Sequence, residues 1–435
     1  MPWSLTEEGF EALSTLRELE DLDLGYARDR PMGDAGLIHL AKLRNLRRLD
    51  LEGVDLTGSS MKYIKPLKGL EELNLQRNPK ITDAGLPELK GLMNLRELRL
   101  GDSSKITDAG VVQLRSLRNL RFVELYRIGP TGLAALKDLP HLDHLKIGSY
   151  DPGPGEPDLS VLRGLKWLEI MHVSGQDSRR AILPPGLRRL DVPYSTAARL
   201  DLGSAKRMDQ VAVHLGRLPS DYDKPRDLKW LSSLPELREL TLFGSFESDV
   251  KAVAGLTSLR RLNLTGNACL PTIGDEGMRS LAGLSNLESL TLEDYYGGGI
   301  KELEVNAGMD VLPKLRNLRR LELRGLPAVT TPALANIWEL KELRVLELHI
   351  SGERLDEPLH DGLAGINALS ELEELSLPLT VRLRLTDDGL KNLASLKKLR
   401  RLDLGSIEGY TDDALASLMR ALPDLQVLKR TYKSR

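Results

Sequence analysis

Residues that could carry out chemistry are sparse in this sequence, and they do not combine into a recognisable reactive pattern. The chain has seven histidines and one cysteine. It contains no H-E-x-x-H pair, no G-x-x-x-x-G-K-[ST] loop, no G-x-S-x-G turn and no Cys/His cluster at metal-ligand spacing. The glycine run at 297–299 lacks the spacing of a dinucleotide-binding loop. We therefore expect no catalytic residue, no metal site, no cofactor and no enzymatic activity.

The single cysteine, Cys269, lies in the segment LNLTGNACLP, in an apolar slot after Asn267. A lone cysteine in such a slot usually serves as a small buried hydrophobe, and a reactive thiol would need a base beside it. One cysteine cannot form an intrachain disulfide, and the segment MPWSLTEEGFEALSTL has no basic start before an apolar run. We therefore expect a cytoplasmic location, with export by a route without a cleavable signal as the alternative.

Aromatic and histidine side chains offer a different kind of chemistry, the recognition of another molecule. The chain has 4 Trp, 10 Tyr and 4 Phe, and about half of them lie between residues 122 and 246. Exposed rings with Arg or His beside them are typical of protein-binding hot spots. The candidate partner-binding residues are Phe122, Tyr126, His144, Lys146, Trp167, Glu169, Met171, Arg189, His214 and Phe243.

A leucine repeat must position these residues. The pattern L-x-x-L-x-x-L-x-L opens with Leu16 to Leu24 and recurs in about 17 units of roughly 21 to 31 residues, the last ending at Leu428. In L-x-L the two leucines point to one side of a short strand, and the residue between them points to the other. Each unit therefore contributes a strand with one buried face and one wet face.

Segments between the strands, such as TDAGLPELKGL, predict short helices. Leu86, Leu89 and Leu92 recur there at helical spacing, and Asp83 is expected to accept hydrogen bonds from the free N–H groups of a following helical turn. Strand, turn and helix repeating in one direction predict an α/β solenoid. This is a curved right-handed stack, with parallel strands on the concave face and short helices or irregular segments on the convex face.

This repetition resembles leucine-rich repeat proteins over essentially the full chain. The segments LNLQRNPKITDAGL and LRLGDSSKITDAGV are similar to the cysteine-containing subclass, with Asn78 and Ser103 where that subclass often has Cys. The TDAGL phrasing resembles bacterial repeat proteins. One unit at 182–192, ILPPGLRRLDV, instead resembles the short repeats of bacterial secreted effectors.

We expect a single repeat domain over 1–435. Ser4 and Glu7 form a capping-box signature for a helix within 1–15, and the repeats run from 16 to 430 before a short tail at 431–435. Between about 126 and 228 the repeats are short, and Pro, Gly and Ser replace the TDAGL segments, so the outer helices are expected to be reduced or lost. Longer insertions are expected at 214–228, 293–310 and 349–362.

The predicted inner face changes character along the chain. It begins acidic, with Asp21, Asp23, Asp50 and Glu52, becomes aromatic in the middle, and later alternates in sign. Alternating charge is typical of a solvated face with cross-strand pairing. The aromatic middle has two interpretations. Its rings form an exposed contact surface, or some of them fold over the sheet to fill space left by missing helices.

Charge and architecture together favour a binding protein. The formal net charge is -2, so no overall positive field attracts nucleic acid or an anionic membrane. Our leading hypothesis is a non-enzymatic scaffold, monomeric when alone, that binds another protein on its concave surface. The alternatives are a secreted bacterial effector acting on a host protein and a sensor of a peptide or small molecule.

Overall fold

The computed structural model describes residues 7–25, 33–151, 158–173, 180–216, 226–245, 247–266, 273–293, 307–326, 331–350, 363, 365–377, 385–405 and 409–429. These residues fall into two compact units, Met1–Met208 and Asp209–Arg435. Ser4, Cys269, the glycine run at 297–299, the tail at 431–435 and the central parts of the three predicted insertions lie outside the described residues.

The first unit contains a parallel sheet in which each strand pairs with the next repeat's strand. Its strands are β1 (Asp21–Asp23), β2 (Arg48–Asp50), β3 (Glu72–Asn74), β4 (Glu97–Leu100), β5 (Phe122–Ile128), β6 (His144–Tyr150), β7 (Trp167–Ile170) and β9 (Arg189–Pro193). A separate pair joins β8 (Ala181–Ile182) to β10 (Leu200–Asp201). The strands therefore lie where the L-x-L motif predicts them.

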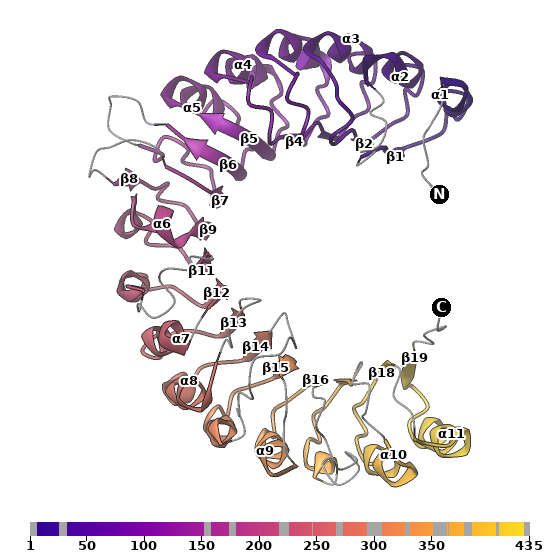
Figure 1. The fold of residues 1–435 in the computed structure, drawn as a ribbon, viewed down its shortest axis with the longest axis vertical. Helices are drawn as coiled ribbons and strands as arrows, with labels where there is room; N and C mark the ends of the chain where they lie inside the picture. Colours follow the sequence, from indigo (N-terminus) through magenta and orange to yellow (C-terminus); the bar gives the residue numbers. More distant parts are fainter. Residues whose placement is uncertain are drawn as a thin grey trace. The chain divides into compact units, whose positions relative to one another are not determined.

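Short helices back this sheet on its outer side (Figure 1). They are α1 (Glu7–Leu13), α2 (Gly33–Leu40), η1 (Gly58–Ser60), α3 (Met61–Ile64), η2 (Asp83–Gly91), α4 (Asp108–Val112), η3 (Gln113–Ser116), α5 (Pro130–Leu136), α6 (Tyr194–Ala197) and η4 (Leu202–Ser204), where η marks a 3-10 helix. The strands of this unit line the inner side of its curve.

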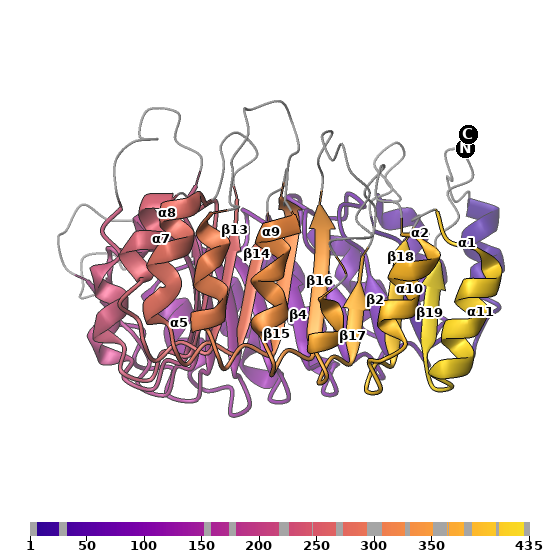
Figure 2. The same cartoon turned by 90° about the horizontal axis from the view of Figure 1, so that it is seen from below.

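The second unit repeats the arrangement, with strands upright side by side and helices in front of them in Figure 2. Its strands are β11 (Gln210–His214), β12 (Glu239–Phe243), β13 (Arg261–Thr265), β14 (Ser289–Glu293), β15 (Arg320–Leu326), β16 (Val345–Ile350), β17 (Glu374–Ser376), β18 (Arg401–Gly405) and β19 (Gln426–Lys429). Its helices are η5 (Lys229–Ser233), α7 (Glu247–Val253), α8 (Asp275–Ser280), η6 (Leu281–Gly283), η7 (Gly308–Lys314), α9 (Thr331–Ala335), η8 (Ile337–Glu339), η9 (Ile366–Ala368), α10 (Asp387–Leu393) and α11 (Asp412–Ala421).

The core of each unit is the leucine face of the sheet. In β4, Leu98 and Leu100 are fully buried, whereas Glu97 and Arg99 lie half-buried on the opposite, inner face. Full burial of such a side chain contributes about 1.5–3 kcal/mol. The alternation fixes which residues face inward, so the predicted inner columns are confirmed by the strand register.

The T-D dipeptide of each TDAG segment links neighbouring repeats. Asp83 accepts hydrogen bonds from the backbone N–H of Thr107 at 2.8 Å and from its hydroxyl at 2.6 Å. Thr107 caps α4, because its hydroxyl accepts from the N–H of Ala109. The prediction that Asp83 caps the helical turn that follows it is wrong. Asp83 is the first residue of η2, whose N-cap position is Thr82, and its carboxylate instead reaches across to the following repeat.

The glycine of the same segment permits close packing between these repeats. A Cβ atom on Gly110 would lie 2.2 Å from Oδ1 of Asp83, and one on Gly85 would lie 2.7 Å from the carbonyl oxygen of Gly58. Real Cβ atoms do not approach so closely, so a larger residue would push the repeats apart. The TDAG segments therefore have a structural role, in the packing of neighbouring repeats.

The outer helix of the repeat after β5 is present, contrary to the expectation of reduced helices from residue 126 onward. Helix α5 has Pro130 in its first turn, and the N–H of Gly129 donates to Oδ1 of Asp108 at 2.7 Å. The PTGL segment thus replaces TDAGL, with Leu133 and Leu136 buried. Further along, α6 is only four residues long. No helix among the described residues has the length and apolar character needed to cross a membrane.

Candidate functional site

A row of stacked side chains crosses the inner face of the first unit, and we call it the aromatic ladder. Phe122, His144, Trp167 and Arg189 occupy matching positions on β5, β6, β7 and β9. Since parallel strands lie about 4.8 Å apart, flat side chains in one column can stack on one another. The ladder is completed by Arg99, which reaches in from the neighbouring column of β4.

The ladder contacts are short and ordered. The rings of His144 and Trp167 stack with centroids 3.7 Å apart and planes 8° apart, and Phe122 tilts against His144 at 4.4 Å. A guanidinium closes each end. Arg99 lies 4.8 Å from the Phe122 ring centroid and Arg189 lies 4.0 Å from the Trp167 centroid. Cation–π contacts of this kind contribute about 0.5–1 kcal/mol at exposed sites.

Burial differs among the predicted contact residues of this unit. Phe122 is only 7% exposed, because His144 and Arg99 lie against it, so it supports the surface and is not an exposed contact residue. His144 and Trp167 are half-buried. Tyr126 and Met171 are 43% and 46% exposed. The predicted residues therefore differ in exposure: Phe122 is covered, whereas Tyr126 and Met171 are open to solvent.

Carboxylates brace the ladder from the neighbouring column. Nε2 of His144 lies 2.8 Å from Oε1 of Glu169, which orients the imidazole. The side chain of Glu124 is only 7% exposed. Its Oε1 pairs with Nζ of Lys146 at 3.0 Å, and its Oε2 accepts a hydrogen bond from Nε2 of Gln76 at 2.7 Å. Gln76 follows β3, so the Glu124 side chain reaches across β4.

Gly101 makes that reach possible. A Cβ atom on Gly101 would lie 2.9 Å from Oε1 of Glu124 and 3.2 Å from its Cδ. The sequence prediction omitted Gln76, Arg99, Gly101 and Glu124 from the site. The register of the L-x-L columns could have placed Glu124 beside Lys146, since the two are partners on neighbouring strands. It could not have predicted that Arg99 extends into the next column to contact Phe122.

The remaining predicted residues lie in the second unit. His214 on β11 and Phe243 on β12 are register partners, and their rings stack at 4.5 Å with planes 12° apart. Phe243 is 37% exposed. The predicted set therefore divides into the aromatic ladder with its neighbours in the first unit and this ring pair in the second.

The later inner face of the second unit is a network of paired charges. Arg324 on β15 donates two hydrogen bonds to Glu347 on β16, at 2.9 and 3.1 Å, and also meets Glu322 and Glu293. The contact with His349, together with Arg324 and against the effect of burial, lowers the pKa of Glu347 to about 2. The cross-strand pairing is what the alternating pattern predicts, but the side chains of Glu322 and Glu347 are only 12% and 17% exposed.

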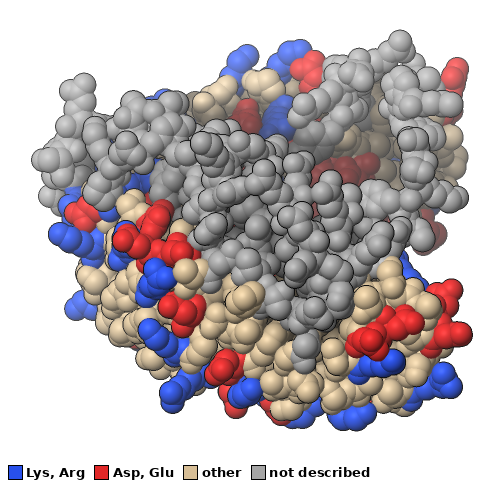
Figure 3. Space-filling view, turned by 60° about the horizontal axis from the view of Figure 1, so that its bottom comes forward, with Lys and Arg blue, Asp and Glu red and all other residues tan. Residues whose placement is uncertain are grey.

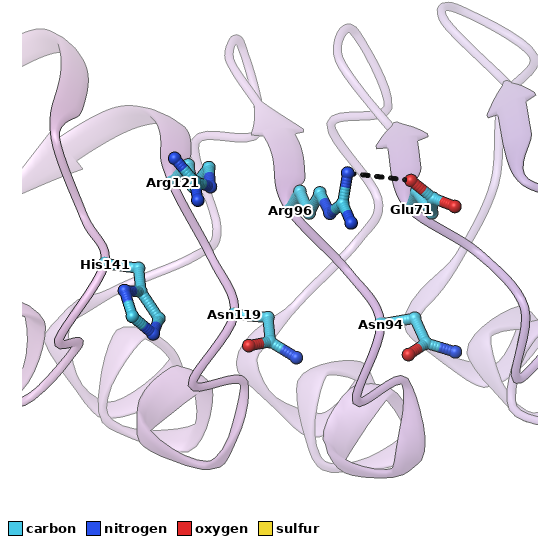
Figure 4. A pocket seen from close by; sticks show the side chains of 6 residues that line it. All are labelled: Glu71, Asn94, Arg96, Asn119, Arg121 and His141. Carbon is cyan, nitrogen blue, oxygen red and sulfur yellow. Dashed lines mark ion pairs between the residues drawn. The ribbon is translucent and has the colours of Figure 1, made fainter.

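A polar hollow of about 190 Å³ lies at the edge of the first unit where strands β3 to β6 begin, and we call it the rim pocket. Figure 4 shows Arg96 and Arg121 beside the strand starts and Asn94, Asn119 and His141 in a second row nearer the helices. Glu71 completes the lining and pairs with Arg96 at 3.2 Å. None of these residues belongs to the predicted site.

Metal chemistry has no candidate centre in the part of the chain that the structure describes, because no group of three His, Cys, Asp or Glu side chains there could hold an ion.

Basic and acidic residues are interspersed on the described surface seen in Figure 3. Such a surface has no extended field of one sign.

Comparison with known proteins supports the repeat fold. A family model described as Leucine Rich repeat matches residues 70–89 and 255–282. The TLR13–ssRNA13 complex gives a TM-score of 0.52 at 16% identity, covering 96% of this chain and 62% of that chain. No curated protein sequence matches the chain.

Two bacterial structures are also similar. An internalin from Listeria monocytogenes is 18% identical, with a TM-score of 0.33 and coverage of 98% of this chain and 95% of its own. A leucine-rich repeat protein of Leptospira interrogans is 18% identical, with a TM-score of 0.33 and coverage of 95% and 85%. At these identities the likeness concerns the fold alone. The repeated sequence, the parallel sheet and the family-model matches support a leucine-rich repeat solenoid fold for this chain.

Proposed function

We propose that this leucine-rich repeat protein is a non-enzymatic scaffold that binds another protein through the aromatic ladder and its exposed neighbours, Tyr126 and Met171. The observation that carries the proposal is the stack of Phe122, His144 and Trp167 between two guanidinium groups on the inner sheet face. Inner faces of repeat proteins commonly serve as extended binding surfaces.

Preorganisation supports this role. The ladder rings are held by each other and by Glu169, so a partner would not have to order them on binding. Immobilising a flexible side chain at an interface costs about 0.5–1.5 kcal/mol, and rings that are already ordered avoid much of that cost. Tyr126 and Met171 lie four residues beyond Phe122 and Trp167 along the chain, with large exposed apolar surface.

The chemistry of this surface favours a protein partner. Tyr, Trp, Met and Arg are the residue types enriched at protein–protein interfaces. Charges nearby are mostly paired, as in Lys146 with Glu124. With a formal net charge of -2, the chain has no excess of cations to follow a nucleic-acid backbone.

The repeat subtype belongs to the same proposal. Asn78 and Ser103, at the positions where the cysteine-containing subclass often has Cys, are both fully buried. Asn78 donates to the carbonyls of Leu51 and Leu75 and accepts from the N–H of Leu56. We infer that these repeats are a TDAGL variant of that subclass, with asparagine replacing cysteine as the buried residue that holds the turn.

A photo-crosslinking amino acid in place of Tyr126 tests the proposal and identifies the partner. The full chain carrying it would be expressed in its native cells, with a second protein carrying the same group in place of Met419 on α11 as the control. Met419 is 46% exposed and lies on an outer helix of the second unit. We expect one protein species to be captured at position 126 and not at 419. Equal capture at both positions, or none at 126, would overturn the proposal.

A further inference from the structure

We propose that the rim pocket is a binding site for a phosphate group. The pocket lies at the starts of the strands and is lined by side chains other than those of the aromatic ladder. The proposal therefore goes beyond the protein-binding role and stands independently of it.

Three of the lining residues occupy the same position in successive repeats, which is asparagine in two of them and histidine in the third. Asn94 and Asn119 follow Leu92 and Leu117 by two residues, and His141 follows Leu139 in the same way. The amides of Asn94 and Asn119 donate to carbonyls of the preceding repeat, those of Lys68 at 3.1 Å and Met93 at 2.7 Å. These bonds hold the floor of the hollow in place.

His141 departs from this pattern. It occupies the asparagine position, but among the described residues no hydrogen bond is found for its ring. The hydrogen bond that Asn94 and Asn119 make to the preceding repeat therefore has no equivalent at His141. The imidazole instead lines the hollow. Its ring N–H is available to donate to a bound group.

Charge in the pocket is only partly balanced. The carboxylate of Glu71 is shared, with Oε1 at 2.9 Å from Arg47 and Oε2 at 3.2 Å from Arg96. Arg121 has its nearest described carboxylate, that of Asp143, at 3.9 Å, which is beyond hydrogen-bonding distance. The lining therefore contains one carboxylate and two guanidinium groups, and a third guanidinium, that of Arg47 outside the lining, also pairs with this carboxylate.

The arrangement of donors favours a tetrahedral oxyanion. Arg96, Arg121 and His141 come from three successive repeats and surround a hollow of about 190 Å³. A phosphate monoester presents three strong acceptor oxygens and carries a charge of about -1.5 to -2. Guanidinium groups match this geometry with paired N–H donors. A carboxylate presents two acceptor oxygens in one plane, against three oxygens in tetrahedral arrangement on a phosphate monoester.

Calorimetric titration of the full chain with inorganic phosphate, O-phosphoserine and acetate tests the site at fixed low ionic strength. We expect phosphate and phosphoserine to bind, with acetate at least fivefold weaker. Arg121→Gln and His141→Ala should each weaken phosphate binding at least fivefold. Arg319→Gln, at the same rim position before β15 in the second unit, serves as the matched control and should leave binding unchanged.

Several results would overturn the proposal. The site is ruled out if neither free phosphate nor O-phosphoserine binds the native chain at millimolar concentration. An equal loss of phosphate affinity in Arg121→Gln and Arg319→Gln would show that anions are attracted to the whole rim and not to the pocket. Acetate that binds as tightly as phosphate would contradict the choice of ligand. Binding of phosphoserine but not of free phosphate, lost in Arg121→Gln, supports a phosphate carried on a larger molecule. Thermal unfolding of each variant confirms that these exposed substitutions leave the fold intact.

Discussion

The imidazole of His144 lies flat on the indole of Trp167, with ring centroids 3.7 Å apart and planes 8° apart. This stack joins two adjacent strands across the inner face, and Arg189 covers the other face of the same indole at 4.0 Å. Trp167 is thus the central member of the aromatic ladder. Its removal should affect both the stability of the first unit and the shape of the surface.

Trp167→Ala is expected to lower the free energy of unfolding by about 2 kcal/mol. The change removes one aromatic pair, worth about 0.5–1.5 kcal/mol, and one cation–π contact, worth about 0.5–1 kcal/mol. Urea unfolding followed by circular dichroism measures the loss. Met171→Ala, which leaves the stack intact, should change stability by less than about 0.5 kcal/mol. Equal losses in the two variants would show that the ladder contacts contribute nothing.

Asp387→Ala is expected to destabilise the second unit by about 1–2 kcal/mol. Its carboxylate accepts from the N–H of Thr411 at 2.7 Å and from the hydroxyl at 3.0 Å, which ties α10 to the next repeat. The adjacent Asp388→Ala is the matched control, since Asp388 instead pairs with Lys391 on its own helix. The midpoint of thermal unfolding should fall for the first variant and barely move for the second. A larger effect at Asp388 would contradict the inter-repeat role of the T-D dipeptide.

Gly101→Ala is expected to cost about 1 kcal/mol, because the added methyl group displaces Glu124 and breaks its hydrogen bond with Gln76. Gln76→Ala removes the same bond directly. If the glycine acts by letting Glu124 pass, the double variant should be less destabilised than the two single losses added together. Urea unfolding of the four proteins gives the coupling energy. Strict additivity would mean that Gly101 acts in some other way.

The lowered pKa of Glu347 is expected to make the free energy of unfolding depend on pH. Its pKa in the folded protein is about 2, against an ordinary value of 4.5. The stabilisation from this ionised carboxylate is therefore complete above about pH 4.5 and is lost as the pH falls through about 2. Glu347→Gln should lower the urea midpoint more at pH 6 than at pH 3.

Glu339→Gln, at the exposed position of helix η8, is the control for the pH measurement, and its effect on the urea midpoint should be small at both pH values. A Glu347→Gln effect that is the same at pH 3 and pH 6 would show that ionisation of this side chain does not stabilise the fold.

The sequence predicts the repeated elements well, because the L-x-L alternation is a local signal. It places Glu97 and Arg99 on the inner face and Leu98 and Leu100 in the core, as the structure has them. Side-chain partners from other repeats are harder to predict. The local pattern makes Asp83 a helix cap, while its actual partner, Thr107, lies 24 residues away. That contact depends on how closely two repeats pack.

The same limit applies to the site. Column position shows that Phe122 faces inward, but its burial depends on the tilt of His144 and the reach of Arg99, which the register does not fix. The rim pocket draws its lining from four repeats, and no short motif contains it. Only the substitution of His141 for asparagine was visible in the sequence, as a departure from the pattern of Asn94 and Asn119.

Affinity for the captured partner tests the central claim most directly. The partner crosslinked at position 126 would be purified and titrated against the native chain, the double variant Tyr126→Ala/Met171→Ala and the control Met419→Ala. Both sites are exposed and lie outside the stack, so the variants should fold normally. We predict at least a tenfold loss of affinity for the double variant and none for the control. Unchanged affinity in the double variant would contradict the proposal that this face binds the partner.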